Sequence, residues 1–442
     1  MLQLKEMLID SPYIAYSYSY PHKTAYRRLE NKISLAKLWQ EERLDSLFLY
    51  LHVPFCEMRC GFCNLFTTPN PKTDFESEYL AALERQASQI AKHFSLATFT
   101  RLAIGGGTPT YLSTKNLEQL LNIPSKYFKI NIANTPTSIE TSPFTATEEK
   151  LELLSEWGIS RVSIGVQSFI ENEVNAVGRS QKTSTVVLAL ENIRKFKFAT
   201  LNIDLIYGLP GQTLESWCES LKIALSFEPE ELYLYPLYIR PLTGLGRQSK
   251  AWNDERVKFY RAGRDLLLEA GYKQHSMRMF QANKTTIDSK QNGLAYCCQT
   301  DGMVGLGAGA RSYTSNLHYS TEYAVSNEGT KEILANYIVK NDLDFTFADY
   351  GFLLDTTEQK HRYIIQSLLQ VDGLNLSVYQ NHFASQALSD LPSLKELLDL
   401  ELAYLRENMM YLTDSGLEKS DIIGYWLYSN KVINLMSDYK LR

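Results

Sequence analysis

YLHVPFCEMRCGFC, residues 50–63, is the stretch that decides the fold and the chemistry of this chain. Cys56, Cys60 and Cys63 stand in a C-x3-C-x2-C pattern directly after an apolar run, so one short loop presents three thiols to one small object. Three soft sulfur ligands on one loop are typical of an iron-sulfur cube. A 4Fe-4S cluster bound by three protein thiolates keeps one iron open, and an open iron can bind a cofactor or substrate.

A structural zinc site is the alternative interpretation of this loop. Zinc accepts three cysteines and one histidine, and His52 is close enough in sequence to be the fourth ligand. Zinc loops usually supply ligands in two separated pairs, however, and the other cysteines lie far away without pair spacing (Cys218, Cys297 and Cys298). We interpret those three as buried or incidental thiols, and the cysteine pattern as a cluster loop rather than a disulfide framework.

Outward from this loop, short apolar runs alternate with amphipathic stretches. Six runs are predicted strands: LFLYLHV (47–53), RLAIGGG (101–107), INIAN (130–134), RVSIGVQS (161–168), TLNIDLIYG (200–208) and ELYLYPLYI (231–239). The segments between them carry apolar residues at three- and four-residue steps, as amphipathic helices require (75–94, 145–158 and 183–196). This alternation predicts an α/β fold with a parallel sheet, either open or closed into a full or partial barrel.

The chain divides into four predicted parts. Residues 1–44, rich in tyrosine and charge, form an N-terminal extension, and residues 45–245 form the barrel. Residues 246–350 extend the barrel and contain a late glycine-rich turn. Residues 351–442 read as helices with a short ending, which suits a small helical or winged domain.

Composition limits the choice of partner and location. The 442 residues carry a net charge of -5 from 45 basic and 50 acidic side chains, so no single-sign field favours nucleic acid or an anionic membrane. We therefore expect a small-molecule substrate. The first residues lack the pattern of a secretory signal and no run is apolar enough for a membrane span, which predicts a cytoplasmic protein.

At the cysteine motif the chain resembles the radical S-adenosylmethionine (radical SAM) superfamily. Within it, the chain is most similar to the group of oxygen-independent coproporphyrinogen III oxidase (HemN) and the haem carrier HemW. Its signature Y-x-H-x-P-F-C-x3-C-x-F-C is matched here by Tyr50, His52, Pro54, Phe55, Cys56, Cys60, Phe62 and Cys63. The resemblance implies a partial (β/α)6 TIM-like barrel, with the cluster loop after the first strand and a small C-terminal helical or winged domain.

The resemblance also implies cofactors and a partner. A 4Fe-4S cluster on the three cysteines would bind S-adenosylmethionine at its open iron and reduce it to release a 5′-deoxyadenosyl radical. A second S-adenosylmethionine molecule is implied too, because HemN binds two. An electron donor such as flavodoxin or ferredoxin would supply the electron.

Further residues match the cofactor-binding motifs of this group. In GGGTPT (105–110), Gly106, Gly107 and Thr108 are implied to contact the methionine moiety, and the missing Cβ atoms let backbone N–H groups approach it. Tyr50 and Phe62 either pack against the cluster and the adenine or serve as core aromatics.

Four polar side chains stand at or just beyond predicted strands, where barrels of this kind place their chemistry: Glu140, Gln167, Arg179 and Asp204. By resemblance, Glu140 pairs with the cofactor ammonium and Arg179 neutralises a carboxylate. Asp204 binds a ribose or an ammonium. Tyr50, Glu140 and Arg179 are the residues we assign to catalysis.

The chain departs from both relatives. HemN has a further cysteine two residues after the third ligand, where this chain has Asn64 and Leu65. HemW has a His-Asn-x2-Tyr-Trp haem motif, where this chain reads QNGLAYCCQTDGM (291–303), before the late turn GLGAGARSY (305–313). Three hypotheses remain: a radical enzyme acting on a porphyrin or similar conjugated molecule, a methyltransferase using a second S-adenosylmethionine, and a haem carrier.

Overall fold

One large sheet organises the computed structural model, which describes residues 4–10, 13, 17, 19–71, 73–247, 254–283 and 297–441. Its strand order is β1-β15-β14-β13-β12-β2-β5-β6-β7-β8-β9-β11-β10. In chain order the strands are β1 Arg27–Ser34, β2 Leu47–Val53, β5 Phe99–Gly106, β6 Thr137–Thr141, β7 Arg161–Gln167, β8 Thr200–Tyr207, β9 Glu231–Pro236, β10 Tyr272–Gln274, β11 Met279–Ala282, β12 Met303–Leu306, β13 Arg311–Tyr313, β14 Leu317–Ser320 and β15 Phe347–Leu353.

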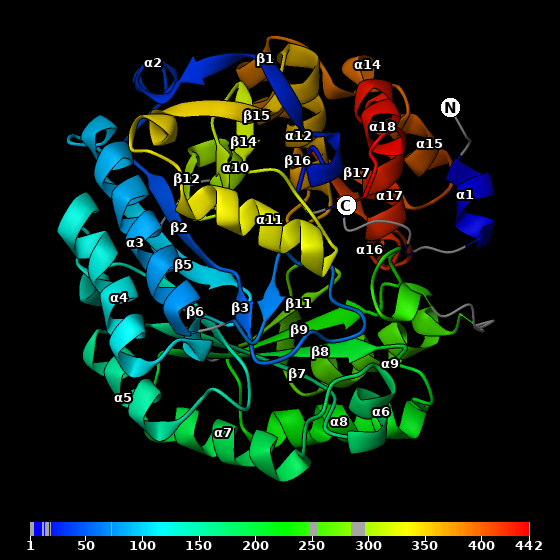
Figure 1. Cartoon of the computed structure of the whole chain (residues 1–442). Helices are drawn as coiled ribbons and strands as arrows, with labels where there is room; N and C mark the ends of the chain where they lie inside the picture. Colours follow the sequence, from blue (N-terminus) through cyan, green and yellow to red (C-terminus); the bar gives the residue numbers. More distant parts are fainter. Residues whose placement is uncertain are drawn as a thin grey trace.

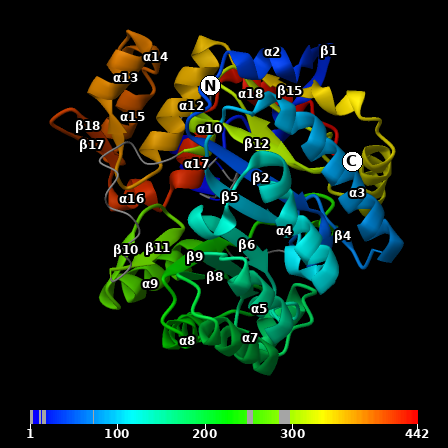
Figure 2. The same ribbon diagram turned by 90° about the vertical axis from the view of Figure 1, so that its left-hand side faces the viewer.

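The middle of this sheet is parallel and curved into a partial barrel. Strands β12, β2, β5, β6, β7, β8 and β9 pair in parallel in that order. Helices lie along the outer, convex side of these strands (Figures 1 and 2). They are α3 Thr73–Ile90, α4 Thr114–Phe128, α5 Glu148–Glu156, α7 Thr183–Lys195 and α8 Leu214–Ser226. The predicted partial barrel is therefore confirmed.

Five of the six predicted strands are present, and the third prediction was wrong. Residues Ile132–Asn134 form a 3₁₀ helix, and the strand in that place is β6, a few residues later. The Asn131 side chain accepts a hydrogen bond from the backbone N–H of Ala133 at 3.1 Å. Such local side-chain to backbone bonds favour turns over strands.

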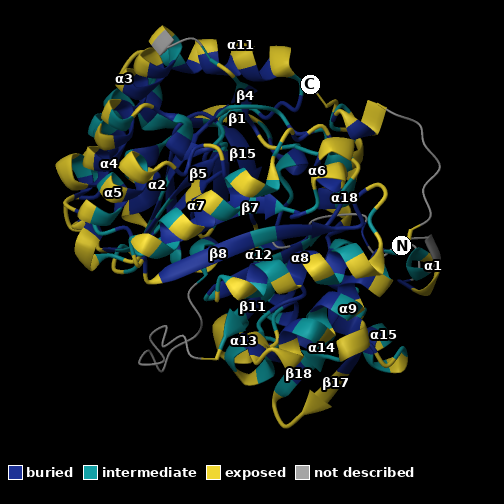
Figure 3. Cartoon of the chain, turned by 90° about the horizontal axis from the view of Figure 1, so that it is seen from below, coloured by how far each residue is buried: buried dark blue, intermediate teal, exposed yellow. Residues whose placement is uncertain are grey.

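The two faces of the parallel strands differ in polarity. Along β2, Leu47, Leu49 and Leu51 are fully buried under the helices, whereas Phe48 and Tyr50 between them remain partly accessible. Period-two alternation produces this division, because successive side chains point to opposite faces of a strand. Seen from below, β8 is buried along nearly its whole length, between exposed helix surfaces (Figure 3). The accessible inner face is where the predicted site residues gather.

The predicted N-terminal extension contributes a strand to the large sheet. Strand β1, from the predicted N-terminal extension, pairs antiparallel with β15, which spans residue 351, the predicted start of the C-terminal domain. The division into four parts stays a prediction. Within the described part of the chain, no helix is long and apolar enough to cross a membrane.

The C-terminal region is mainly helical and has its own apolar core. It contains α12 Thr356–Leu368, α13 Leu376–Phe383, α14 Ala387–Asp390, α15 Leu394–Asp399, α16 Asp414–Leu417, α17 Ser420–Trp426 and α18 Asn430–Ser437, with the small sheet β16 Leu374–Asn375, β18 Met409–Leu412 and β17 Ala403–Arg406. The remaining helices are α1 Leu4–Asp10, α2 Leu35–Gln40, α6 Glu171–Ala176, α9 Arg256–Glu269, α10 Cys298–Asp301 and α11 Asn327–Ile338.

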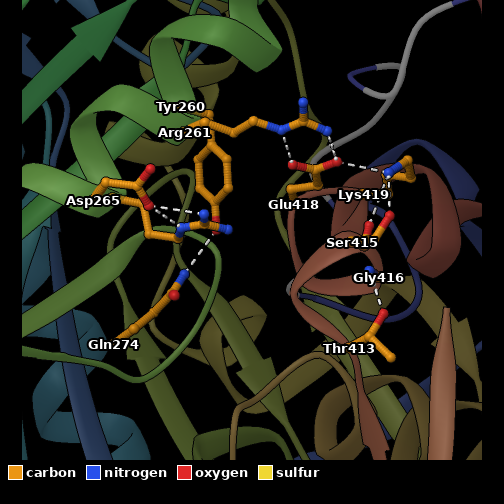
Figure 4. Close-up of polar contacts among 10 residues, drawn as sticks. Tyr260, Arg261, Asp265, Gln274, Thr413, Ser415, Gly416, Glu418 and Lys419 are labelled. Atoms are coloured by element: carbon orange, nitrogen blue, oxygen red, sulfur yellow. Dashed lines mark hydrogen bonds and ion pairs between the residues drawn. The ribbon is translucent and has the colours of Figure 1, made fainter. Parts of the chain in front are cut away.

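Ion pairs join this region to the barrel extension. Arg261 of α9 donates two hydrogen bonds, of 2.7 and 2.8 Å, to the carboxylate of Glu418, which also accepts from Lys419 (Figure 4). Deeper in the same interface, Arg278 pairs with Asp421 of α17, and both side chains are buried. The C-terminal region is thus held to α9 and to the start of β11 by buried charge as well as by apolar packing.

Candidate active site

The cysteine loop begins and ends at a pair of two-residue parallel strands. β3 (Phe55–Cys56) pairs with β4 (Thr68–Pro69), and the backbone N–H of Asn70 donates to the carbonyl of Cys56 at 2.9 Å. Within the loop, the N–H of Cys63 donates to the carbonyl of Cys60 at 3.0 Å. These bonds close the loop, so all three thiols come from one compact segment.

Gly61 attaches this loop to the far side of the barrel. Its N–H donates to the carbonyl of Val177 at 2.7 Å, and its carbonyl accepts from the N–H of Leu245 at 2.8 Å. A Cβ atom on Gly61 would lie 2.8 Å from the Val177 oxygen, so only glycine allows this approach. The loop therefore spans the mouth of the barrel between β3 and the turns after β7 and β9.

Two of the three sulfur atoms have a polar partner. The Thr108 hydroxyl donates to Cys56 Sγ at 3.6 Å, and Arg179 Nη1 donates to Cys60 Sγ at 3.3 Å. Both donors favour the thiolate form. Burial nevertheless raises the pKa of Cys56 to about 12 and also raises the pKa of Cys60. Such thiols ionise when a bound cation compensates the charge, so the three thiols and their donors fit a 4Fe-4S cluster.

His52, the alternative zinc ligand, is already engaged. Its Nδ1 lies 3.1 Å from the Tyr50 hydroxyl and its Nε2 lies 3.2 Å from the carbonyl oxygen of Phe66. Burial lowers the pKa of His52 to about 4, which keeps the ring neutral. Zinc binding would break one of these contacts.

The glycine-rich loop after β5 lies against the cysteine loop. A Cβ atom on Gly107 would come within 2.5 Å of the Phe55 carbonyl and 2.9 Å of Cys56 Sγ. Gly106 has φ of 115° and faces the His52 ring, where a Cβ atom would lie within 2.4 Å. This backbone conformation and this close approach both require glycine. The loop thus provides a cradle of bare backbone beside the first cysteine.

Glu140 completes this cradle from β6. Its Oε2 accepts a hydrogen bond from the Gly106 N–H at 2.8 Å, and a Cβ atom on Gly105 would meet its carboxyl carbon at 2.7 Å. The Glu140 side chain is exposed to solvent although protein surrounds it on all sides, so it lines the inside of the barrel. Burial raises the pKa of Glu140 to about 7, and the Gly106 N–H opposes that shift. A bound ammonium would restore the ionised carboxylate.

Asp204 and Gln167 lie on the next strands of the inner face. Asn202 donates to Asp204 Oδ1 at 2.8 Å and the Ser163 hydroxyl to Oδ2 at 3.4 Å. Burial raises the pKa of Asp204 to about 6, and these bonds lower it. Gln167 has φ of 71°, in the left-handed region, where the register between β7 and β8 shifts. A non-glycine residue in this region is strained, and such strain is often found at functional sites.

Arg179 reaches the cysteine loop from the turn after α6. Besides Cys60, its guanidinium donates to the Gln181 side chain at 2.8 Å and to the Gly165 carbonyl at 2.7 Å. Its described partners are thus a sulfur atom and two neutral oxygens. Phe62 packs on a small apolar cluster that includes Val177 and Leu245. Contacts of Phe62 with cofactor and of Arg179 with a carboxylate stay predictions.

Sequence analysis missed three residues of β9 that face the same interior. Tyr233 and Tyr235 stack, with ring centroids 6.0 Å apart and planes 20° from parallel. Glu231 accepts a hydrogen bond from Arg161 Nε at 2.8 Å. The run ELYLYP alternates polar or aromatic residues with leucine, and this period of two could have placed them on the face of Asp204.

Comparisons with known proteins agree with this geometry. Residues 50–224 match the radical SAM superfamily. The haem chaperone HemW of Bacillus subtilis (strain 168) is 28 % identical over 394 residues, which cover 86 % of this chain and 98 % of HemW. Oxygen-independent coproporphyrinogen III oxidase of Escherichia coli (strain K12) is 34 % identical over 231 residues, 50 % of this chain and 49 % of the oxidase.

A solved structure has the same fold over the whole length. Coproporphyrinogen III oxidase (HemN) from Escherichia coli superposes with a TM-score of 0.80 at 24 % identity, covering 98 % of this chain and 99 % of that one. The match of residues 50–224 to the radical SAM superfamily confirms the resemblance predicted from the cysteine motif. A radical SAM domain implies a 4Fe-4S cluster and S-adenosylmethionine.

Proposed function

We propose that residues 50–224, which match the radical SAM superfamily, form a radical SAM domain. On this premise, the chain is an enzyme that abstracts hydrogen from a porphyrin or a similar conjugated molecule. The observation that carries this proposal is the pairing of the Gly106 N–H with the Glu140 carboxylate directly beside the cysteine loop. When bound, a reduced 4Fe-4S cluster would supply one electron for the cleavage of S-adenosylmethionine to a 5′-deoxyadenosyl radical.

The chain's own residues would bind and shield these groups. Cys56, Cys60 and Cys63 would hold the cluster, and Glu140 would bind the cofactor ammonium above the backbone of Gly106. Asp204 would bind the ribose or the ammonium. With substrate and cofactor bound, the curved sheet with its outer helices would limit the access of bulk water, which protects a reactive species from side reactions.

Two other functions keep specific support. The similarity to HemW over 98 % of its length favours a haem carrier, although the first six residues of the stretch that replaces the haem motif, 291–296, lie outside the described residues. A methyltransferase would need a second S-adenosylmethionine molecule, and the stacked Tyr233 and Tyr235 offer an aromatic surface for a flat ligand on the same inner face.

Product analysis separates the three functions. The protein is reconstituted anaerobically with iron and sulfide, reduced with dithionite, and incubated with S-adenosylmethionine and candidate tetrapyrroles. We expect 5′-deoxyadenosine and a decarboxylated or dehydrogenated product. S-adenosylhomocysteine formed alongside would select methyl transfer. Tight haem binding without cofactor cleavage would select the carrier and contradict the enzymatic proposal.

Replacing Glu140 with glutamine should weaken S-adenosylmethionine binding. The substitution keeps the shape but removes the charge that would pair with the cofactor ammonium, and hydrogen bonds to charged groups contribute about 1.5–3 kcal/mol, or about 10- to 100-fold in affinity. Equilibrium dialysis against the reconstituted protein measures this effect. Glu148→Gln is the matched control, because Glu148 lies on the outer helix α5 and pairs there with Lys195.

The affinity for S-adenosylmethionine should also depend on pH through Glu140. Burial raises its pKa from 4.5 to about 7, and an ammonium binds the carboxylate rather than the neutral acid. Binding must therefore displace a proton, so affinity should fall as the pH decreases below about 7. The same dialysis repeated across this pH range should show no such fall in Glu140→Gln. An equal fall in both proteins would assign the dependence to another group.

A further inference from the structure

Two donors from distant parts of the chain meet at the carbonyl of Asn64, the residue after the third cysteine. Lys23 Nζ donates to this oxygen at 3.4 Å and the Tyr323 hydroxyl at 2.6 Å. The Lys23 ammonium also lies 3.8 Å from the centre of the Tyr323 ring. The N-terminal segment therefore reaches the cysteine loop.

The surroundings of Lys23 are fixed by further contacts. It begins a short 3₁₀ helix, Lys23–Ala25, where the side chain of His22 accepts from the N–H of Thr24. The segment after β14, which carries Tyr323, makes a second contact with the cysteine loop. Arg59 of the loop donates a hydrogen bond to the carbonyl of Val325 in this segment. Lys23 thus belongs to a packed layer over the loop.

The Lys23 ammonium lies at the residue that directly follows the third ligand. Burial, together with the positive charges of Arg311 and Arg240, lowers the pKa of Lys23 to about 7, and the negative charge of an ionised Cys63 opposes that shift. Among the residues that the structure describes, no carboxylate forms an ion pair with Lys23. A cluster on three thiolates carries net negative charge and would favour the ammonium form further. Thr108 thus lies at Cys56 and Arg179 at Cys60, while the Lys23 ammonium lies one residue beyond Cys63, at the Asn64 carbonyl.

We propose that Lys23 is a positioning residue of the cluster site, whose ammonium at the Asn64 carbonyl, one residue after Cys63, stabilises the reduced cluster and so makes it easier to reduce. This inference rests on the proposed function, because it requires that the three cysteines hold a cluster. Reduction adds one negative charge, and a positive charge nearby in a water-poor site lowers the free energy of the reduced form. The N-terminal segment would thereby be part of the redox site.

A redox titration of Lys23→Met, which keeps the length and packing of the side chain, tests this role. With the cluster followed by electron paramagnetic resonance, we expect about a tenfold lower ratio of reduced to oxidised cluster at a given potential, which is about 59 mV for one electron. Lys23→Arg should restore the ratio. Lys37→Met, on the exposed side of α2, should leave it unchanged.

Tyr323→Phe separates charge from position. It removes the other hydrogen bond to the same Asn64 carbonyl without removing a charge, so its shift should be much smaller than that of Lys23→Met. An equal shift in both, or no shift in Lys23→Met with a fully loaded cluster, would overturn the inference while the proposed function stands. If the unaltered protein takes up no cluster, both fail. If Lys23→Met loads no cluster, Lys23→Gln carries the comparison.

Discussion

Cys60→Ala is expected to abolish cluster binding and, with it, the formation of 5′-deoxyadenosine. Cys60 is the most buried of the three thiols, with 8 % of its surface exposed, and it accepts a hydrogen bond from Arg179. Alanine would leave two thiolates and a buried guanidinium without its sulfur partner. The loop offers no replacement, because His52 is bonded to Tyr50 and Phe66. Iron and sulfide analysis, together with the sulfur-to-iron charge-transfer absorbance, measures the loss of the cluster.

Cys218→Ala provides the matched control for this experiment. Cys218 lies on the outer helix α8 and is partly buried, so the same chemical change is made away from the loop. We expect full cluster content and full deoxyadenosine yield in this variant. If Cys60→Ala kept its cluster absorbance, the assignment of the ligands would be wrong.

Asp421→Asn is expected to give the largest loss of stability. Asp421 is 0 % exposed, pairs with Arg278, which is 2 % exposed, and also accepts a hydrogen bond from the Tyr238 hydroxyl. Breaking a buried ion pair from one side costs about 3–5 kcal/mol, because the other charge stays buried without its counter-ion. Since this pair joins α17 to the barrel extension, the C-terminal region should loosen first.

Urea unfolding followed by circular dichroism measures this loss of stability. Asp45→Asn is the control, because the pair of Asp45 with Arg43 is exposed and such pairs contribute little. The unfolding midpoint should fall clearly in Asp421→Asn and stay in place in Asp45→Asn. Equal midpoints in the two variants would show that the buried pair contributes no more than a surface pair.

Neither the relatives nor the residues of the site select one of the three proposed functions. HemW is matched over nearly its full length, and the oxidase is matched at higher identity over about half of its length. The cluster loop, the glycine cradle and Glu140 suit any of the three proposed functions, because all of them bind the same cofactors. The choice among them depends on the substrate that the inner face accepts.

Local patterns in the sequence were enough for most of the barrel. The alternation of apolar residues in β2, β5, β7, β8 and β9 and the spacing of the amphipathic helices are properties of short segments, so they can be read without the fold. The prediction failed at INIAN, residues 130–134. There the Asn131 side chain accepts a hydrogen bond from the backbone N–H of Ala133, and this favours a turn over the strand that the apolar residues suggest. A competition between two local preferences of similar size is hard to decide from sequence.

The sequence by itself determined the three cysteines and the glycine cradle, because both lie within recognisable local motifs, whereas β6, the strand that carries Glu140, was not predicted. Only the tertiary structure decided that Arg179 donates to Cys60 across 119 residues and that Lys23 and Tyr323, from distant segments, share the Asn64 carbonyl. It also decided that β1 pairs with β15. These contacts depend on the order of strands in the sheet and on how the chain crosses between them, and no local pattern encodes that order.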